Sequence, residues 1–184
     1  MQQHIATALL GAVVLSGCAS QGGGGMAMNA QAQAGLPDAV RVPDGHRVAM
    51  ETVGAGEVSY ECRASRDRPG QFEWVFVGPE ATLTARGGQR VGRYYGPPAT
   101  WESLDGSRVT GVQQAVAPAG EGHLPLQLVK ANPAMGSGAM QGVTYIQRLA
   151  TRGGVAPAEA CGAEKAGQKT VVRYQADYIF WRAA

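Results

Sequence analysis

Residues 171–181, VVRYQADYIFW, indicate the fold class most clearly. Apolar and polar side chains alternate along this stretch. The apolar set is Val172, Tyr174, Ala176, Tyr178 and Phe180, and the polar set is Arg173, Gln175 and Asp177. A β-strand points successive side chains to opposite faces, whereas a helix would scatter these residues around its circumference. The alternation therefore predicts a strand with one buried face.

Similar but shorter alternating runs occur upstream, at residues 47–51, 58–63 and 71–77. Turn-forming pairs separate such segments: Asp44-Gly45, Pro69-Gly70, Gly87-Gly88, Pro97-Pro98, Asp105-Gly106 and Gly153-Gly154. Residues 157–166, PAEACGAEKA, are the one segment expected to be helical, and residues 131–141 are expected to form an irregular loop. The chain is therefore predicted to be mainly β, an antiparallel β-sandwich or barrel-like domain with at most one short helix.

The N-terminus has the features of an export signal. Residues 5–15, IATALLGAVVL, form an apolar run too short to span a bilayer, which needs about 20 helical residues, but suited to a signal peptide. Residues 15–18, Leu-Ser-Gly-Cys, follow this run and resemble the lipobox of bacterial lipoproteins, in which the chain is cut before a lipidated cysteine. We therefore expect residues 1–17 to be a signal peptide and Cys18 to carry lipid. The alternative is an ordinary signal peptide with an incidental cysteine.

Charged residues occur only from Asp38 onward. No Lys, Arg, Asp or Glu occurs before Asp38, and residues 19–37 are rich in Gly, Ala and Gln. A globular surface needs charged side chains, so residues 18–37 are predicted to form a flexible tether and residues 38–184 a single domain. The residue after the lipobox cysteine is Ala19 rather than the Asp that commonly retains lipoproteins in the inner membrane. The expected location is thus the outer membrane, with the lipid on Cys18 as the membrane contact.

Composition and cysteine count restrict the chemistry. A formal charge of +2, without a basic cluster, argues against nucleic-acid binding. If Cys18 is lipidated, Cys62 and Cys161 remain as an even pair in an oxidising compartment, which favours a disulfide. Two free buried thiols or a metal pair are the alternatives, although the spacing of these cysteines is a poor zinc signature.

Five segments of the domain resemble the DUF3455 family of bacterial and fungal secreted proteins. They are VPDGHRVAMETVGAGEVSYECRA (42–64), FEWVFVGPEATL (72–83), VGRYYGPPATWESLDGSRVTG (91–111), GVTYIQRLATRGGVAPAEAC (142–161) and VVRYQADYIFW (171–181). The resemblance includes both domain cysteines, which supports their pairing. It implies no established activity, and no nucleotide-cofactor motif of the form G-x-G-x-x-G follows a predicted strand, so no cofactor is expected.

The densest candidate site is the aromatic and proline cluster at residues 94–105. Tyr95 and Trp101 could stack on a sugar or peptide, with Glu102 and Asp105 as hydrogen-bond acceptors. The alternative is that Trp101 packs in the core. His46 and His123 stand beside glycines without metal-ligand spacing, so no metal site is expected.

Three functions remain open from these residues. The first is a non-enzymatic module that binds a glycan, a small molecule or an envelope protein through Tyr95 and Trp101. The second is an envelope hydrolase that uses carboxylates or His46, although no serine lies in a G-x-S-x-G elbow. The third is a purely structural surface protein. The absence of a catalytic motif favours the first.

Overall fold

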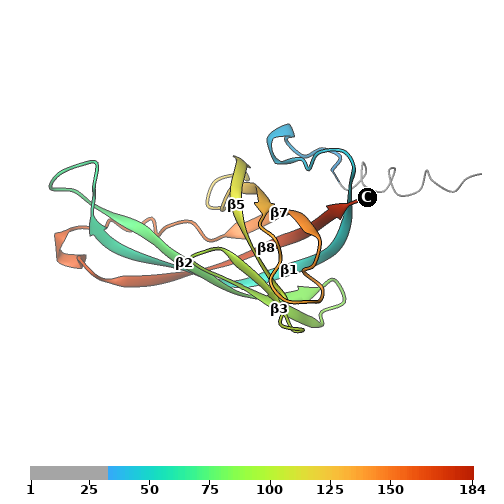
Figure 1. Cartoon of the computed structure of the whole chain (residues 1–184). Helices are drawn as coiled ribbons and strands as arrows, with labels where there is room; N and C mark the ends of the chain where they lie inside the picture. The colour runs from blue at the N-terminus through green and yellow to red at the C-terminus, as the bar shows by residue number, and fades with distance from the viewer. Residues whose placement is uncertain (1–32) are drawn as a thin grey trace, which may run out of the picture.

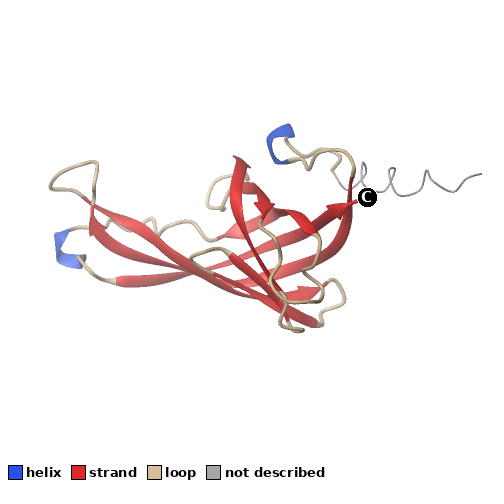
Figure 2. Ribbon diagram, in the orientation of Figure 1, coloured by secondary structure: helices blue, strands red, loops and turns tan. Residues whose placement is uncertain are grey.

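The structure is a computed structural model that describes residues 33–184. Eight antiparallel strands follow one another around a closed barrel, and β8 pairs with β1 to complete it (Figures 1 and 2). The strands are β1 (His46–Ala64), β2 (Phe72–Ala85), β3 (Arg90–Tyr95), β4 (Thr100–Ser103), β5 (Arg108–Ala117), β6 (Leu126–Ala131), β7 (Val143–Gly153) and β8 (Lys169–Ala183). The predicted class, a mainly β barrel-like domain, is confirmed.

The helix expected at residues 157–166 is wrong. Only one 3-10 turn, η2 (Ala163–Lys165), forms there. The backbone carbonyls of this loop instead bind neighbouring side chains: Trp74 Nε1 donates to the Glu159 carbonyl at 2.9 Å and Lys165 Nζ donates to that of Ala160 at 3.0 Å. The disulfide at Cys161 also holds the loop against β1, so tertiary contacts replace the bonds of a helix. The irregular loop expected at 131–141 lies between β6 and β7 as predicted.

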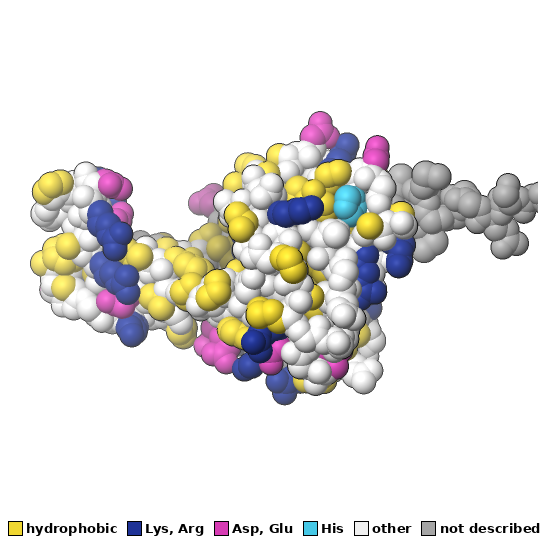
Figure 3. Space-filling model, in the orientation of Figure 1, with side chains coloured by type: hydrophobic (Ala, Val, Ile, Leu, Met, Phe, Trp, Pro, Cys, Tyr) yellow, Lys and Arg dark blue, Asp and Glu magenta, His cyan; other side chains and the backbone are white. Residues whose placement is uncertain are grey.

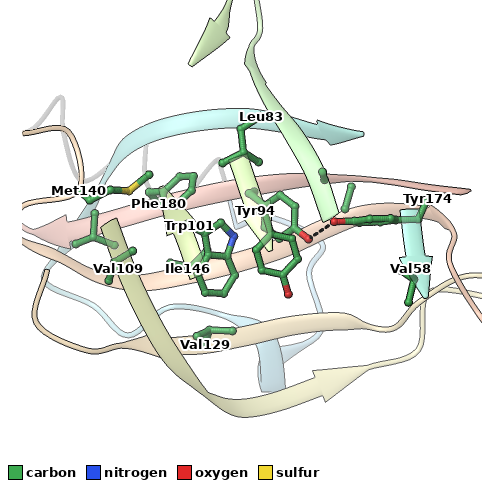
Figure 4. Close-up of a cluster of buried hydrophobic side chains, with 14 of the residues drawn as sticks. Val58, Leu83, Tyr94, Trp101, Val109, Val129, Met140, Ile146, Tyr174 and Phe180 are labelled. Carbon is green, nitrogen blue, oxygen red and sulfur yellow. Dashed lines mark hydrogen bonds between the residues drawn. The ribbon is translucent and has the colours of Figure 1, made fainter. Parts of the chain in front are cut away.

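The barrel interior is filled by side chains, with Trp101 and Tyr94 in the middle of the cluster (Figure 4). The predicted inward face of the last strand is confirmed, because Tyr174, Ala176, Tyr178 and Phe180 are all buried in this cluster. Tyr174 and Tyr178 place their hydroxyl oxygens 3.2 Å apart, and burial raises the pKa of both phenols. The interior is therefore a packed core rather than a channel.

A second apolar cluster lies on the outer wall of the barrel. Ile179 and Trp181, on the opposite face of β8 from Phe180, pack against Val40 and Val42 of the segment that precedes β1. This segment includes the second 3-10 turn, η1 (Asp38–Val40). The Gln147 side chain, which is fully buried, joins the layers: its amide donates to the Val40 carbonyl and its oxygen accepts from Trp181 Nε1 at 2.8 Å. Residues 36–42 therefore cover part of the barrel wall.

Parts of β1, β2 and β8 extend beyond the barrel as a projection, here called the finger, which is defined as residues 58–64, 72–78 and 169–173 (Figure 1). Cys62 and Cys161 form a disulfide with a sequence separation of 99, which confirms the predicted pair and ties the β7–β8 loop to the finger. Figure 1 shows the finger tip at the opposite end of the molecule from residues 33–42. The finger is thus stapled near its tip and points away from the N-terminal segment.

The predicted signal peptide and the lipidation site at Cys18 lie outside the described residues, as does most of the predicted tether. Gln33 and Leu36, which fall within the range predicted for the tether, contact the domain: Gln33 Nε2 donates to the Val42 carbonyl at 3.0 Å, and Leu36 packs on the outer cluster. Among residues 33–184, no helix has the length and apolar character needed to cross a membrane.

Candidate functional site

The hairpin of β3 and β4 brings together two of the residues predicted to form a site. Tyr95 donates its hydroxyl to Glu102 Oε2 at 2.8 Å, and Arg93 Nη2 donates to both carboxylate oxygens at 3.1 Å. The guanidinium carbon of Arg93 also lies 4.7 Å from the centroid of the Tyr95 ring. These bonds from Tyr95 and Arg93 lower the pKa of Glu102, while the bond to the carboxylate raises the pKa of Tyr95. The tyrosine ring is thereby held in one orientation on the outer wall.

This triad adjoins an open groove of about 590 Å³ on the outer wall of β8, β1, β2 and β3. One rung of the sheet crosses it, because Arg173 pairs with Glu57, Glu57 with Glu80, and Glu80 with Tyr95. The next rung has the small residues Ala55 and Thr82 between Gln175 and Arg93. Long polar side chains therefore stand beside a floor of small ones, which makes the wall concave.

Gly56 allows the strands to approach closely at this point. A Cβ atom on Gly56 would lie 2.1 Å from the Glu80 carbonyl oxygen and 2.5 Å from Ala81 Cα. Any other residue would force β1 and β2 apart where the finger leaves the barrel. The groove thus depends on the close approach of β1 and β2 that this glycine permits.

Several charged groups of the groove have no ionic partner. Among the described residues, Glu57, Glu80, Arg90 and Arg173 form none of the ion pairs, although Arg93 is paired with Glu102. Glu57 and Glu80 stand directly opposite each other on neighbouring strands, an arrangement that is unfavourable for like charges. These guanidinium and carboxylate groups therefore have no partner at ion-pair distance within residues 33–184, although the charge of Glu80 contributes to the raised pKa of Arg93.

Trp101 is not part of this groove, which corrects its assignment as a ligand contact. Its side chain is 1 % exposed and stacks on Tyr94 with ring centroids 4.7 Å apart. The reason is register: Trp101 pairs with Tyr94 and Val109 on an inward-facing rung, whereas Glu102, the next residue, faces outward. The alternative reading, a core tryptophan, is the right one.

Asp105 also lies apart from the groove. Its carboxylate accepts hydrogen bonds from the Ser107 amide at 2.8 Å and the Ala139 amide at 2.7 Å. These bonds, together with that from the Ser107 hydroxyl, lower the pKa of Asp105 to about 2. Asp105 therefore joins the β4–β5 turn to the loop before β7, which is a structural role.

Neither His46 nor His123 lies in a catalytic arrangement. His46 Nδ1 lies 2.9 Å from the Pro43 carbonyl, and its ring meets Tyr145 edge-on at 4.9 Å. His123 Nδ1 accepts a hydrogen bond from the Gly153 amide at 3.0 Å. Within residues 33–184, no group of three or more His, Cys, Asp or Glu side chains could hold a metal ion.

The model of one protein family matches residues 43–182, from just before β1 to the penultimate residue of β8. The chain belongs to the DUF3455 family. This family is described as protein of unknown function. No curated protein and no solved structure matches the chain. The DUF3455 match includes every groove residue and both bridged cysteines, but it begins after residues 36–42, which cover the barrel wall.

Sequence reasoning found Tyr95 and Glu102 but missed the charged residues of this DUF3455 groove. Arg173 was expected on the solvent face of its strand, and Glu57 and Glu80 gave no local signal. They meet because β1 pairs with both β2 and β8 in a specific register. The β1–β8 pairing joins Glu57 to Arg173, 116 positions further along the chain, so spacing along the chain could not reveal the groove.

Proposed function

We propose that this chain is an exported, lipid-anchored binding module of the bacterial envelope, and that its outer groove binds a saccharide that carries acidic groups. The observation that carries the proposal is the combination, in one groove, of unpaired guanidinium groups on Arg90 and Arg173 with the fixed ring of Tyr95. Aromatic faces stack on sugar rings, and arginines bind carboxylates through paired hydrogen bonds. Glu57 and Glu80 would accept hydrogen bonds from hydroxyl groups.

The anchor rests on the Leu-Ser-Gly-Cys motif at residues 15–18 behind an apolar run. A tether from Cys18 to residue 37 would have a reach of about 25 Å, which is enough to hold a small domain clear of the lipid headgroups. The Ala at position 19 favours the outer membrane. The groove would then face the periplasm or the cell surface, where acidic saccharides such as cell-wall fragments occur.

Calorimetric titration with a soluble disaccharide-peptide fragment of the bacterial cell wall tests the groove. We expect binding to weaken at least tenfold in Tyr95→Ala and in Arg173→Ala. The control is Arg47→Ala, which removes an exposed arginine near the start of β1, outside the groove. A neutral chitin oligosaccharide should bind more weakly than the acidic fragment, because it offers the arginines no carboxylate.

Absence of binding to both saccharides, or equal affinities in all three variants, would contradict the groove as a glycan site. Cleavage of either saccharide during the titration, lost in Glu57→Gln, would instead favour the hydrolase alternative. That alternative rests on the two facing carboxylates, because glycoside hydrolysis commonly uses such a pair. His46 has no part in it, since it does not line the groove.

A further inference from the structure

The finger has two edges, and each leaves part of the backbone without a neighbouring strand. Residues 72–78 of β2 pair with β1 alone, because the pairing of β2 with β3 begins at Glu80. Residues 169–173 of β8 also pair with β1 alone, because the pairing of β8 with β7 begins at Tyr174. Within the described part of the chain, no other backbone bonds reach these two stretches. Each edge therefore offers a row of unused donors and acceptors.

The two edges differ in chemistry. The β8 edge has Lys169 and Arg173 at its ends, and edge lysines and arginines are a common protection against pairing with another chain. The β2 edge runs Phe72-Glu73-Trp74-Val75-Phe76, and its one charge, Glu73, is neutralised by Arg68 at 3.0 Å. The Phe76 side chain is 51 % exposed. Figure 3 shows apolar side chains along the finger between the barrel and the basic residues near its tip.

A third edge, in β5, is also protected. Residues 111–117 pair with β6 but extend beyond the short strand β4. This stretch has Gln113 and Gln114 and a bulge in its register, and both features oppose strand addition. Val112 and Val116 are exposed on the β5 edge and Val171 on the β8 edge, but glutamines and a bulge interrupt the first and basic residues end the second. Residues 72–76 of β2 instead pair with β1 without a bulge and have no unpaired charge.

We propose that the β2 edge of the finger, residues 72–76, binds an extended segment of another protein by strand addition. Main-chain hydrogen bonds would supply affinity, and the side chains in alternate rows would supply specificity. Phe72, Trp74 and Phe76 form one row, which requires apolar residues at every second position of the partner. Proline is excluded from the bonded positions because it lacks the amide hydrogen.

A second copy of the chain fits this edge poorly. Two β2 edges paired antiparallel about Trp74 would place Gly70 of one copy opposite Gly78 of the other. The edge at Gly78 is already covered, because the β3–β4 turn lies directly against it. A Cβ atom on Gly78 would be 2.1 Å from the Gly96 carbonyl oxygen in that turn. The tip loop of the second copy, residues 65–71, would collide with this turn. A free extended segment that ends before residue 78 avoids the collision.

The test uses a phage-displayed library of random decapeptides selected against the purified, oxidised full-length protein. We expect the enriched peptides to alternate apolar and other residues and to lack central prolines. A fluorescein-labelled peptide synthesised from the enriched set should lose at least tenfold in affinity for Phe76→Lys. It should bind Val171→Lys as it binds the wild type, because Val171 is 54 % exposed on the opposite edge of the finger.

The same peptide with alternate backbone amides methylated separates strand addition from mere apolar contact. Strand addition predicts that methylation of the bonded set of amides abolishes binding. Failure to enrich any peptide, or equal affinity for Phe76→Lys and the wild type, would overturn the proposal. It would also be overturned if the wild type sediments as a dimer and Phe76→Lys as a monomer, since the edge would then be filled by a second copy.

Discussion

Neighbouring residues in the segment 94–105 have different roles, although their chemistry is similar. Tyr94 and Trp101 are buried and stack on each other, whereas Tyr95 and Glu102 face outward and bond to each other. The division follows from the alternation of side chains along a strand. Residues that are adjacent in the sequence therefore form two separate groups, one inside the barrel and one on its outer wall.

Asp105 gives a testable pH dependence at this scale. Its pKa is lowered from 3.8 to about 2 by hydrogen bonds from Ser107 and Ala139. A pKa that is lower in the folded state means that the charged form stabilises the protein above about pH 4, and that this stabilisation is lost as the pH falls toward 2. We expect Asp105→Asn to lower the urea midpoint at pH 6 and the difference from wild type to shrink between pH 4 and 2.5.

Asp44→Asn is the matched control. Asp44 is exposed in another turn, and its carboxylate forms no ion pair with residues 33–184. The difference between this variant and wild type should stay small at every pH. If Asp105→Asn and Asp44→Asn behave alike across this pH series, the proposed role of Asp105 is wrong.

At the scale of elements, the finger is the feature that most needs a covalent constraint. It is a three-stranded sheet without a full hydrophobic core of its own, and such sheets depend on additional packing for stability. The β7–β8 loop provides that packing on one face through the Cys62–Cys161 disulfide and the bond from Trp74 to the Glu159 carbonyl. We infer that the loop stays irregular because these contacts with the finger replace the hydrogen bonds that a helix would form.

Removal of the disulfide should therefore destabilise the protein, and the finger should unfold more readily than the barrel. Closing a loop of about 100 residues stabilises a protein by about 4.7 kcal/mol in the chain-entropy model. The double variant Cys62→Ser, Cys161→Ser should lose stability up to this amount in urea unfolding. Hydrogen exchange in the double variant should be faster than in the wild type, and the increase should be larger at residues 58–64 and 72–78 than in the barrel part of β8.

Reduction of the wild type should reproduce both effects, while the double variant should be insensitive to the reductant. Equal unfolding midpoints for the oxidised, reduced and double-serine forms would show that the disulfide does not contribute to stability.

At the scale of the whole molecule, two functions would be separated in space. The groove lies on the barrel wall where the finger begins, and the proposed docking edge lies along the finger itself. The finger points away from residues 33–42, which include the end of the predicted tether (Figure 1). In a lipid-anchored protein, this arrangement would hold the docking edge at the end most distant from the membrane.

The anchor itself is tested by intact-mass spectrometry of the protein from its native host. We expect a chain that starts at Cys18 and carries a lipid increment, with two thiols that become reactive only after reduction. Cys18→Ala should release the protein into the soluble fraction. An unlipidated wild-type chain in that fraction would contradict the predicted address.

The sequence by itself determined the properties that depend on local periodicity and cysteine parity. Alternation over 171–181 identified a strand and its buried face, glycine and proline pairs indicated a chain of many strands, and two cysteines in the domain indicated one bridge. These features are local because the two faces of a strand and the conformation of a turn are set by consecutive residues.

Only the tertiary structure decided which distant residues share a surface. Closure of the barrel buried Trp101, register brought Arg173, Glu57, Glu80 and Tyr95 onto one rung, and residues 36–42 covered Ile179 and Trp181. The predicted helix at 157–166 failed for the same reason, since a disulfide and a tryptophan from other strands hold that loop. Pairing between strands depends on non-local contacts, so a groove or a free edge between them cannot be read from the spacing of residues along the chain.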